Sequence, residues 1–220
     1  MVERPEIKFC GLTRPEDAAL AAALGARYVG AIMAGGPRTR MPEEARLVLA
    51  AGASAQRVVV VRLAEPGVMA EAARTVGADI LQLHADPELA LVRALRHEWT
   101  GGIWAVVRMG TMGLPGDLSA LFEACDAVVL DSAVPSGLGG SGIVFDWASA
   151  AAPLRQARGR GRLVLAGGLH SGNISDAVQA LDPDVLDVSS GIEESPGVKS
   201  PDRMRAFARA VATLTPPSTE

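Results

Sequence analysis

The sequence has only two cysteines, and it has no apolar run that approaches the length of a membrane span. Cys10 and Cys125 have neither the spacing of metal ligands nor that of a disulfide framework, a pattern that fits a reducing cytosol and predicts no metal site. The chain begins with charged residues at Glu3, Arg4 and Glu6, where a signal peptide would be apolar. We therefore expect a cytoplasmic protein with no membrane partner.

Aromatic residues and basic runs are also scarce. Aromatics make up 4% of the residues and apolar residues 49%, so the core has to be built from Ala, Val and Leu. Basic residues are scattered and the formal net charge is -4, which offers no surface for nucleic acid and leaves small solutes as the expected partners. A chain of 220 residues can form one full-sized core. We expect a single domain over residues 1–220, with only residues 216–220 frayed.

Short apolar runs without polar alternation recur along the chain. Strands of this kind are buried on both faces, which is typical of parallel sheets. Between them, apolar residues recur at helical spacing after start signals such as Thr13, Pro15 and Glu16, the pattern of a capping box. The pattern predicts strands over residues 7–10, 28–33, 57–61, 80–83, 103–107, 127–131, 163–166 and 185–188. It predicts helices that begin near residues 13, 42, 66, 87, 118, 147, 173 and 201.

Eight strand–helix units in 220 residues predict a single (β/α)8 TIM barrel. The alternative is an open, doubly wound sheet with extra strands. We favour closure because no predicted strand carries the charges or prolines of a solvent-facing edge. In a barrel the chemistry lies at the C-terminal ends of the strands, so the residues to inspect are Cys10, the Arg38 loop, His84, Arg108, Asp131 and two glycine turns.

The two glycine turns are candidates for a phosphate site. In residues 165–169 and 187–191, an apolar run stops at small residues, which leaves backbone N–H groups exposed at the end of a strand. A helix that begins just after such a turn adds the positive end of its dipole. Each turn alone is equally well explained as an ordinary connection. Two successive turns favour an anion site, built from Gly167, Gly168, Ser189, Ser190 and Gly191.

Cys10 and Asp131 end the first and sixth predicted strands, roughly opposite one another across the barrel mouth. A thiol and a carboxyl that face one pocket can act as base and acid, provided that the surroundings favour the thiolate and keep the carboxyl protonated when needed. A cysteine is more often an inert core residue, but the position of Cys10 at a strand end favours a functional role. The longest irregular stretch, residues 132–145, has the length of a functional or mobile loop.

Several blocks of the sequence, in this order, resemble the blocks of phosphoribosylanthranilate isomerase, a TIM-barrel enzyme of tryptophan biosynthesis. A single glycine-rich block is a weak signal, but the ordered set is specific. The blocks span residues 8 to 199 and comprise residues 8–18, 82–84, 130–132, 139–142, 145–147, 165–169, 187–193 and 196–199.

The resemblance implies an Amadori rearrangement of N-(5-phosphoribosyl)anthranilate to 1-(2-carboxyphenylamino)-1-deoxyribulose 5-phosphate, with no cofactor. It implies that Asp131 is the general acid that protonates the furanose ring oxygen, and that Cys10, as thiolate, removes the proton from the sugar C2. It assigns Arg38 to the anthranilate carboxylate, because a guanidinium fork suits a planar carboxylate. Arg40 is a competing assignment, since this loop resembles the family only loosely. The alternative for both arginines is a solvated surface position.

His84 either hydrogen-bonds the substrate or caps the barrel interior. Asp187 is expected to be a satisfied internal acceptor, with steering of Arg38 or of substrate as the alternative. Lys199 is expected to pair with a carboxylate rather than to touch substrate. We interpret the remaining residues of interest as structural: His97 and His170 at the surface and Cys125 in packing.

The chain departs from the family pattern at Ala31, Ala85, Trp104 and Ile143, and its third strand lacks the usual glycine and aromatic. These departures alter the cavity walls but not the acid or the base. Two alternatives therefore stay open beside the isomerase: a non-catalytic phosphosugar-binding homologue, and another phosphosugar barrel enzyme. The histidine-pathway aminoaldose isomerase is the example, and it is expected to place an aspartate where Cys10 stands. Whether the protein is a monomer or a homodimer also stays open.

Overall fold

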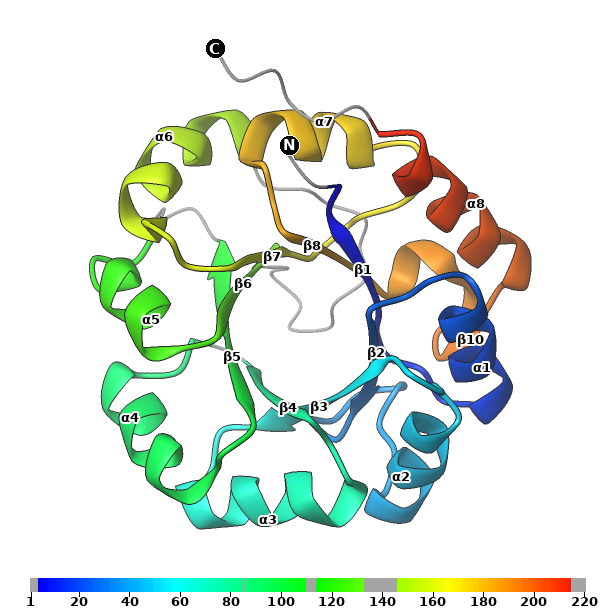
Figure 1. The fold of residues 1–220 in the computed structure, drawn as a ribbon, viewed down its shortest axis with the longest axis horizontal. Coiled ribbons are helices and arrows are strands. Elements are labelled where there is room, and N and C mark those ends of the chain that lie inside the picture. The colour runs from blue at the N-terminus through cyan, green and yellow to red at the C-terminus, as the bar shows by residue number, and fades with distance from the viewer. Residues whose placement is uncertain (1–3, 85, 110–113, 133–145, 215–220) are drawn as a thin grey trace.

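The structure is a computed structural model, which describes residues 4–84, 86–109, 114–132 and 146–214 and contains a closed barrel of parallel strands (Figure 1). The strands β1 to β8 follow one another around the ring in sequence order. They are β1 (Glu6–Phe9), β2 (Tyr28–Ile32), β3 (Gln56–Arg62), β4 (Ile80–His84), β5 (Gly102–Met109), β6 (Ala127–Ser132), β7 (Leu163–Leu165) and β8 (Val185–Val188).

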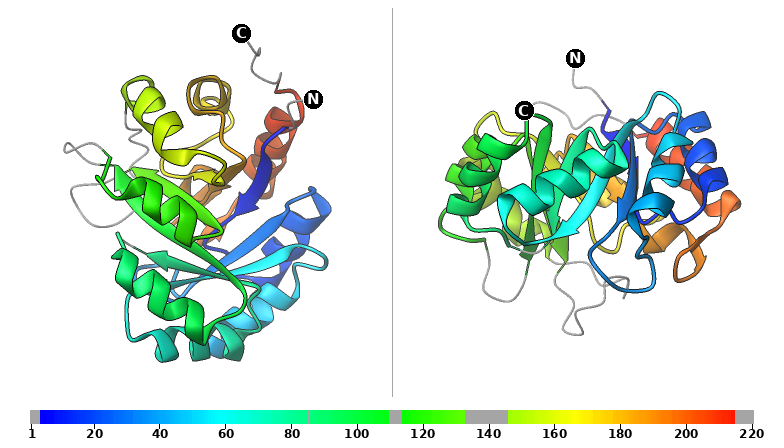
Figure 2. Two further views of the ribbon diagram at one scale, coloured as in Figure 1. Left: turned by 60° about the vertical axis from the view of Figure 1, so that its left-hand side comes forward. Right: turned by 90° about the horizontal axis from the view of Figure 1, so that it is seen from below.

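Helices alternate with the strands and surround the ring on its outside (Figures 1 and 2). A 3₁₀ turn η1 (Ser190–Ile192) and a hairpin of β9 (Glu193–Ser195) and β10 (Val198–Lys199) follow β8. The α-helices are α1 (Pro15–Ala23), α2 (Pro42–Ala50), α3 (Pro66–Val76), α4 (Leu89–Glu98), α5 (Leu118–Ala124), α6 (Trp147–Arg158), α7 (Ile174–Leu181) and α8 (Pro201–Ala212). None of the helices in the described residues has the length and hydropathy that a membrane crossing requires.

The TIM barrel predicted from the sequence is confirmed. β1 pairs in parallel with β8, with Lys8 opposite Asp187 and Phe9 opposite Val188, which closes the ring and excludes the open-sheet alternative. The strand boundaries agree with the prediction to within about two residues. The predicted loop of residues 132–145 lies almost wholly outside the described residues, as do residues 216–220 and the departures at Ala85 and Ile143.

The predicted capping box of the first helix is wrong. The N-cap of α1 is Arg14, and it makes no side-chain cap hydrogen bond. The Thr13 hydroxyl instead donates to the Gly197 carbonyl, 2.5 Å away in the turn of the β9–β10 hairpin. A tertiary contact has therefore taken the hydroxyl that the local pattern assigned to the helix end, while Pro15 still begins the helix as expected.

Two layers of buried side chains lie on opposite faces of the strands. The larger cluster fills the space between strands and helices and is built mainly from Ala, Val and Leu, as the composition predicts. A smaller cluster contains Tyr28 and Trp104, whose rings meet edge to face with centroids 4.9 Å apart, together with aliphatic residues of the other strands. Because successive strand residues point to opposite faces, this second set and the residues two positions further along each strand point into the barrel.

Candidate active site

A cavity of about 610 Å³ lies at the C-terminal ends of the barrel strands. The inward face of each strand leads to it: Lys8 is followed by Cys10, Gln82 by His84, and Val129 by Asp131, in steps of two residues. The alternation that packs the barrel interior therefore also aims the reactive groups at the cavity. The predicted site residues that line it are Cys10, Arg38, His84, Asp131, Gly167, Gly168, Ser189 and Ser190.

Cys10 is buried directly after β1, where its backbone N–H donates to the Val188 carbonyl at 2.9 Å. A Cβ atom at Gly30 would stand 3.0 Å from the Cys10 Sγ and 3.3 Å from the Lys8 Cε, so thiol and lysine lie side by side over this glycine. Burial raises the pKa of the Cys10 thiol, and the neighbouring Lys8 ammonium opposes that rise. The resting form at neutral pH is therefore the thiol, with a buried cation beside it that favours the thiolate.

Lys8 has no exposed surface and is a residue whose role the sequence analysis missed. Its Nζ donates to Asp187 Oδ2 at 2.6 Å and to Gln82 Oε1 at 2.9 Å, and it lies 5.8 Å from the centroid of the Trp104 ring. Burial lowers the pKa of Lys8, but Asp187 and Cys10 raise it by more, so the side chain remains an ammonium. The sequence signal that could have identified this role is a lysine in the middle of an otherwise apolar strand.

Asp131 ends the inward face of β6 and its carboxyl is poised between its two protonation states. Burial raises the pKa of Asp131 to about 6, and the negative charge of Asp187 adds to this rise. Gly167 packs so closely that a Cβ there would overlap Ser132 and the Asp131 carboxylate. A carboxyl with this pKa can donate a proton near neutral pH, which is what a general acid requires.

Asp187 is only partly the satisfied acceptor that the sequence predicts. Its Oδ2 accepts the Lys8 ammonium, whereas its Oδ1 is buried and has no hydrogen-bond partner among the residues that the structure describes. Asp187 also lines the cavity. Its position places one carboxylate within electrostatic reach of Cys10, Lys8 and Asp131.

The two glycine turns lie together at one side of the cavity. Gly167 and Gly168 both have positive φ, at 81° and 67°, which a residue with a Cβ would adopt only with strain. Gly191 does not line the cavity; a Cβ there would overlap the Leu169 carbonyl, so glycine is what lets the two turns meet. Ser189 and Ser190 complete this set, which we refer to as the small-residue end of the cavity.

The predicted starts of α7 near residue 173 and of α8 near residue 201 are confirmed, but neither helix begins directly at its glycine turn. Only the three-residue turn η1 follows β8, and α7 begins at Ile174, after Asn173 has donated its side-chain amide to the Gly168 carbonyl at 3.0 Å. Any anion at the small-residue end is therefore held by loop amides and serine hydroxyls more than by a helix dipole.

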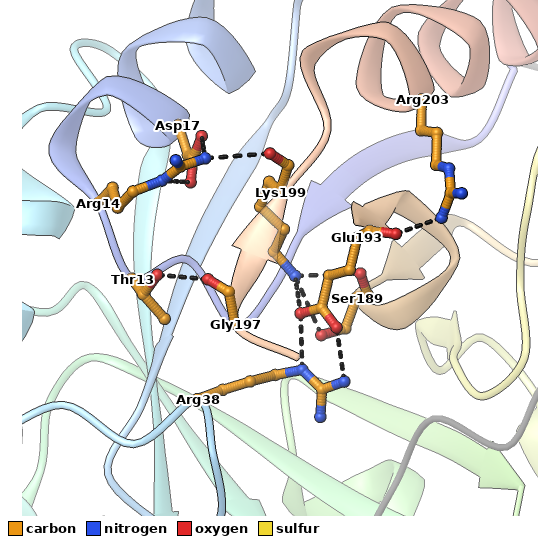
Figure 3. Close-up of polar contacts among 9 residues, drawn as sticks. All are labelled: Thr13, Arg14, Asp17, Arg38, Ser189, Glu193, Gly197, Lys199 and Arg203. Atoms are coloured by element: carbon orange, nitrogen blue, oxygen red, sulfur yellow. Dashed lines mark hydrogen bonds and ion pairs between the residues drawn. The ribbon is translucent and has the colours of Figure 1, made fainter. Parts of the chain in front are cut away.

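Arg38 also lines the cavity and is largely buried, with 13% of its side chain exposed, so it is not a solvated surface arginine. Its Nε and Nη2 donate to the two carboxylate oxygens of Glu193, both at 2.7 Å (Figure 3). Arg40 does not line the cavity and pairs with Glu44 at 3.8 Å. The geometry favours Arg38 over Arg40 as a group that meets a ligand.

His84 is exposed at the rim of the cavity and so does not cap the barrel interior. Burial of its ring and the nearby Arg108 lower the pKa of His84, which keeps the imidazole neutral at neutral pH. His97 and His170 are exposed, as expected. Cys125 is half-buried beside α5, and burial raises its pKa to about 12, which fits a packing role.

Comparisons with known proteins agree with this geometry. The sequence matches the family described as N-(5'phosphoribosyl)anthranilate (PRA) isomerase over residues 7–210. It is 36% identical over 216 residues to an N-(5'-phosphoribosyl)anthranilate isomerase of Xanthomonas oryzae pv. oryzae, covering 94% of this chain and 93% of the relative.

Two solved structures are similar in fold. One is a phosphoribosyl anthranilate isomerase from Thermotoga maritima, with a TM-score of 0.82, 30% identity and coverage of 96% of this chain and 100% of that chain. Another is a phosphoribosyl anthranilate isomerase in complex with reduced 1-(o-carboxyphenylamino)-1-deoxyribulose 5-phosphate, with a TM-score of 0.79, 27% identity and coverage of 96% and 100%.

The raised pKa of Asp131 predicts that this residue destabilises the folded protein. Between pH 3.8 and about 6 the carboxyl ionises in the unfolded chain but not in the folded one, so the free energy of unfolding falls as pH rises through this window. Asp131→Asn should therefore raise the free energy of unfolding at pH 8 by roughly 1–3 kcal/mol. Urea denaturation of both proteins at pH 8 and pH 3.5 measures this difference. A gain of the same size at both pH values, or a loss at pH 8, would contradict the assignment.

Proposed function

The chain belongs to the N-(5'-phosphoribosyl)anthranilate isomerase family, and we propose that Cys10 is the base and Asp131 the acid of the isomerisation that this membership gives it in tryptophan biosynthesis. The observation that carries the proposal is that these two groups, from the ends of β1 and β6, line one cavity together with Arg38 and the small-residue end. The site of the reaction is cytoplasmic in this proposal. In support, both cysteines are free thiols, as a reducing compartment favours.

The substrate carries an anion at each end, and the cavity lining offers a group suited to each of them. Arg38 binds the anthranilate carboxylate, and the small-residue end binds the 5'-phosphate through Gly167, Gly168, Ser189 and Ser190, with Gly191 holding the two turns together. His84, neutral at the rim, is placed to donate or accept one hydrogen bond to the bound sugar. This arrangement brings the ribose between Cys10 and Asp131.

Ring opening comes first. Asp131, protonated in part near neutral pH because of its raised pKa, gives its proton to the furanose ring oxygen. The C1–O bond breaks as the anthranilate nitrogen forms a double bond to C1, which produces a positively charged Schiff base. This step leaves Asp131 as an ionised carboxylate. The positive charge of the nearby Schiff base stabilises that form.

Proton transfer from carbon follows. Cys10, as thiolate, takes the proton from C2, and the C–H electrons form a C1–C2 double bond while the C1–N double-bond electrons return to nitrogen. The resulting enolamine gains a proton at C1 and loses one from the C2 hydroxyl, so the product is the ketose and the overall change is an isomerisation. The Schiff base is the electron sink, so the substrate itself supplies the group that accepts the electrons.

The Lys8 ammonium lowers the free energy of forming the Cys10 thiolate, although the thiol is buried. The ammonium lies beside the thiol and is fixed by Asp187 and Gln82, so it does not need to reorganise when the thiol ionises. As an ammonium it also cannot accept the proton in place of Cys10. The buried cation is thus a fixed electrostatic support for the base.

The alternatives that the sequence left open predict different substrates or no turnover at all. A non-catalytic homologue would bind the phosphosugar without turnover, and a histidine-pathway isomerase would turn over a different aminoaldose. The thiol at position 10, where that enzyme is expected to have an aspartate, favours the anthranilate substrate. Loss of phosphoribosylanthranilate fluorescence on addition of the protein identifies the anthranilate isomerase, and turnover of the histidine-pathway aminoaldose distinguishes the other two alternatives from each other.

Removal of either proton-transfer group should abolish most of the turnover. Cys10→Ser and Asp131→Asn should each lower kcat by at least about a hundredfold, since each removes a group that acts in the transition state. Steady-state fluorescence kinetics measure kcat, and circular dichroism checks that both variants fold. If either variant keeps more than about a third of the wild-type kcat, its assigned role is wrong.

The two neighbouring arginines should differ in their effect on substrate affinity. Arg38→Lys keeps the charge but loses the guanidinium fork, so it should raise KM at least about tenfold with a smaller change in kcat. The matched change Arg40→Lys should leave KM within about twofold, since Arg40 lies away from the cavity lining. The reverse order of the two KM values would assign the carboxylate to Arg40.

A further inference from the structure

A buried ion pair lies behind the cavity, outside its lining. Lys199 of β10 and Glu193 of β9 face one another across the hairpin, with Lys199 Nζ 2.9 Å from Glu193 Oε1 (Figure 3). Lys199 is 1% exposed and Glu193 6% exposed. The predicted pairing of Lys199 with a carboxylate is confirmed. The sequence analysis did not predict which carboxylate it is, or which other residues Lys199 and Glu193 contact.

Glu193 fixes the orientation of Arg38. Both carboxylate oxygens accept from the guanidinium at 2.7 Å, a bidentate geometry that sets the plane of the fork. Burial raises the pKa of Glu193, but the hydrogen bonds from Arg38 and Lys199 outweigh this and hold the pKa below its usual range. Glu193 therefore stays ionised and holds Arg38 throughout the neutral range.

Lys199 fixes Ser189 at the small-residue end. Its Nζ donates to the Ser189 carbonyl at 3.0 Å and to the Ser189 hydroxyl at 3.3 Å, in addition to Glu193. These three acceptors match the three hydrogens of an ammonium. One buried cation thus joins the serine that lines the small-residue end to the carboxylate that holds Arg38.

Gly11 lets these two parts of the cavity approach each other. A Cβ at this position would stand 2.7 Å from the Arg38 Cδ and 2.8 Å from the Ser189 Oγ, and its φ of 65° is itself one that favours glycine. Arg38 and Ser189 are therefore close neighbours, and their separation depends on Glu193, which contacts Arg38, and on Lys199, which contacts Ser189.

We propose that Lys199 and Glu193 are positioning residues that hold Arg38 and Ser189 at a fixed separation, so that both anionic ends of the substrate are bound at once. This inference rests on the proposed function, which assigns the carboxylate to Arg38 and the phosphate to the small-residue end. The trio of Arg38, Lys199 and Glu193 carries a net positive charge, which favours the anionic substrate. Because the trio is already fixed before the substrate binds, less conformational entropy is lost on binding.

The hairpin that carries the pair has other anchors, so a structural role alone does not account for it. Arg14 donates to the Lys199 carbonyl at 3.0 Å and pairs with Asp17, and Arg203 donates to the Glu193 carbonyl (Figure 3). These contacts hold the hairpin backbone and touch neither Arg38 nor Ser189. Arg14, at the start of α1, therefore offers a matched control, since its removal deletes a cation that contacts the same hairpin.

The test uses inorganic phosphate and anthranilate as separate probes of the two ends, with dissociation constants measured by calorimetry or by competition with substrate. Lys199→Met should weaken both probes at least about fivefold. Glu193→Gln should weaken anthranilate at least about fivefold, leave phosphate within about twofold, and raise KM with kcat within about threefold. Arg14→Met should leave both probes within about twofold.

The double variant gives the sharpest result. Because Lys199 and Arg38 share the Glu193 carboxylate, the loss of anthranilate affinity in the combined variant should be smaller than the product of the two single losses. The inference would be overturned if the fold-loss of anthranilate affinity in the double variant equalled the product of the two single losses. Unchanged anthranilate binding in Lys199→Met, or a loss in Arg14→Met as large as that in Lys199→Met, would also overturn it. If Lys199→Met does not fold, the predicted split between the two probes in Glu193→Gln decides. Absence of turnover in the wild type would instead refute the proposed function, since the binding constants do not depend on turnover.

Discussion

The buried ion pair between Lys8 and Asp187 is the interaction on which the site depends. It joins the first and last strands of the barrel, since the two residues are direct neighbours in the β1–β8 register. Burial raises the pKa of both Cys10 and Asp131, and the same pair acts on both groups, because Lys8 opposes the first rise and Asp187 adds to the second. One pair of charges thus lies where the barrel closes and influences the protonation of both the base and the acid.

The charges around the cavity have a simple order. Lys8 lies beneath the reactive centre, Arg38 lines the cavity, and Glu193 and Lys199 lie behind its lining, each cation being held by a buried carboxylate. A buried cation left without its carboxylate would be costly, and a buried carboxylate without its cation equally so. The pairs therefore fix positive groups in place where an anionic substrate needs them.

Much of this could be predicted from the sequence, and the failures have physical reasons. The barrel follows from apolar strands without alternation, and Cys10 and Asp131 stand out because each ends such a strand. The partners of Lys8 and of Arg38 could not be predicted, since Asp187 and Glu193 lie far away in the sequence. The helix-end pattern failed at Thr13 for the same reason, because a distant carbonyl took its hydroxyl.

The claim that one buried lysine supports the base is tested most directly by the reactivity of Cys10 itself. The rate of alkylation of the Cys10 peptide by iodoacetamide, followed by mass spectrometry from pH 6 to pH 10, reports the thiolate fraction without any need for turnover. In Lys8→Gln the midpoint should move to higher pH, and the rate at pH 8 should fall at least about fivefold. An unchanged profile, or one moved to lower pH in a folded variant, would contradict the account.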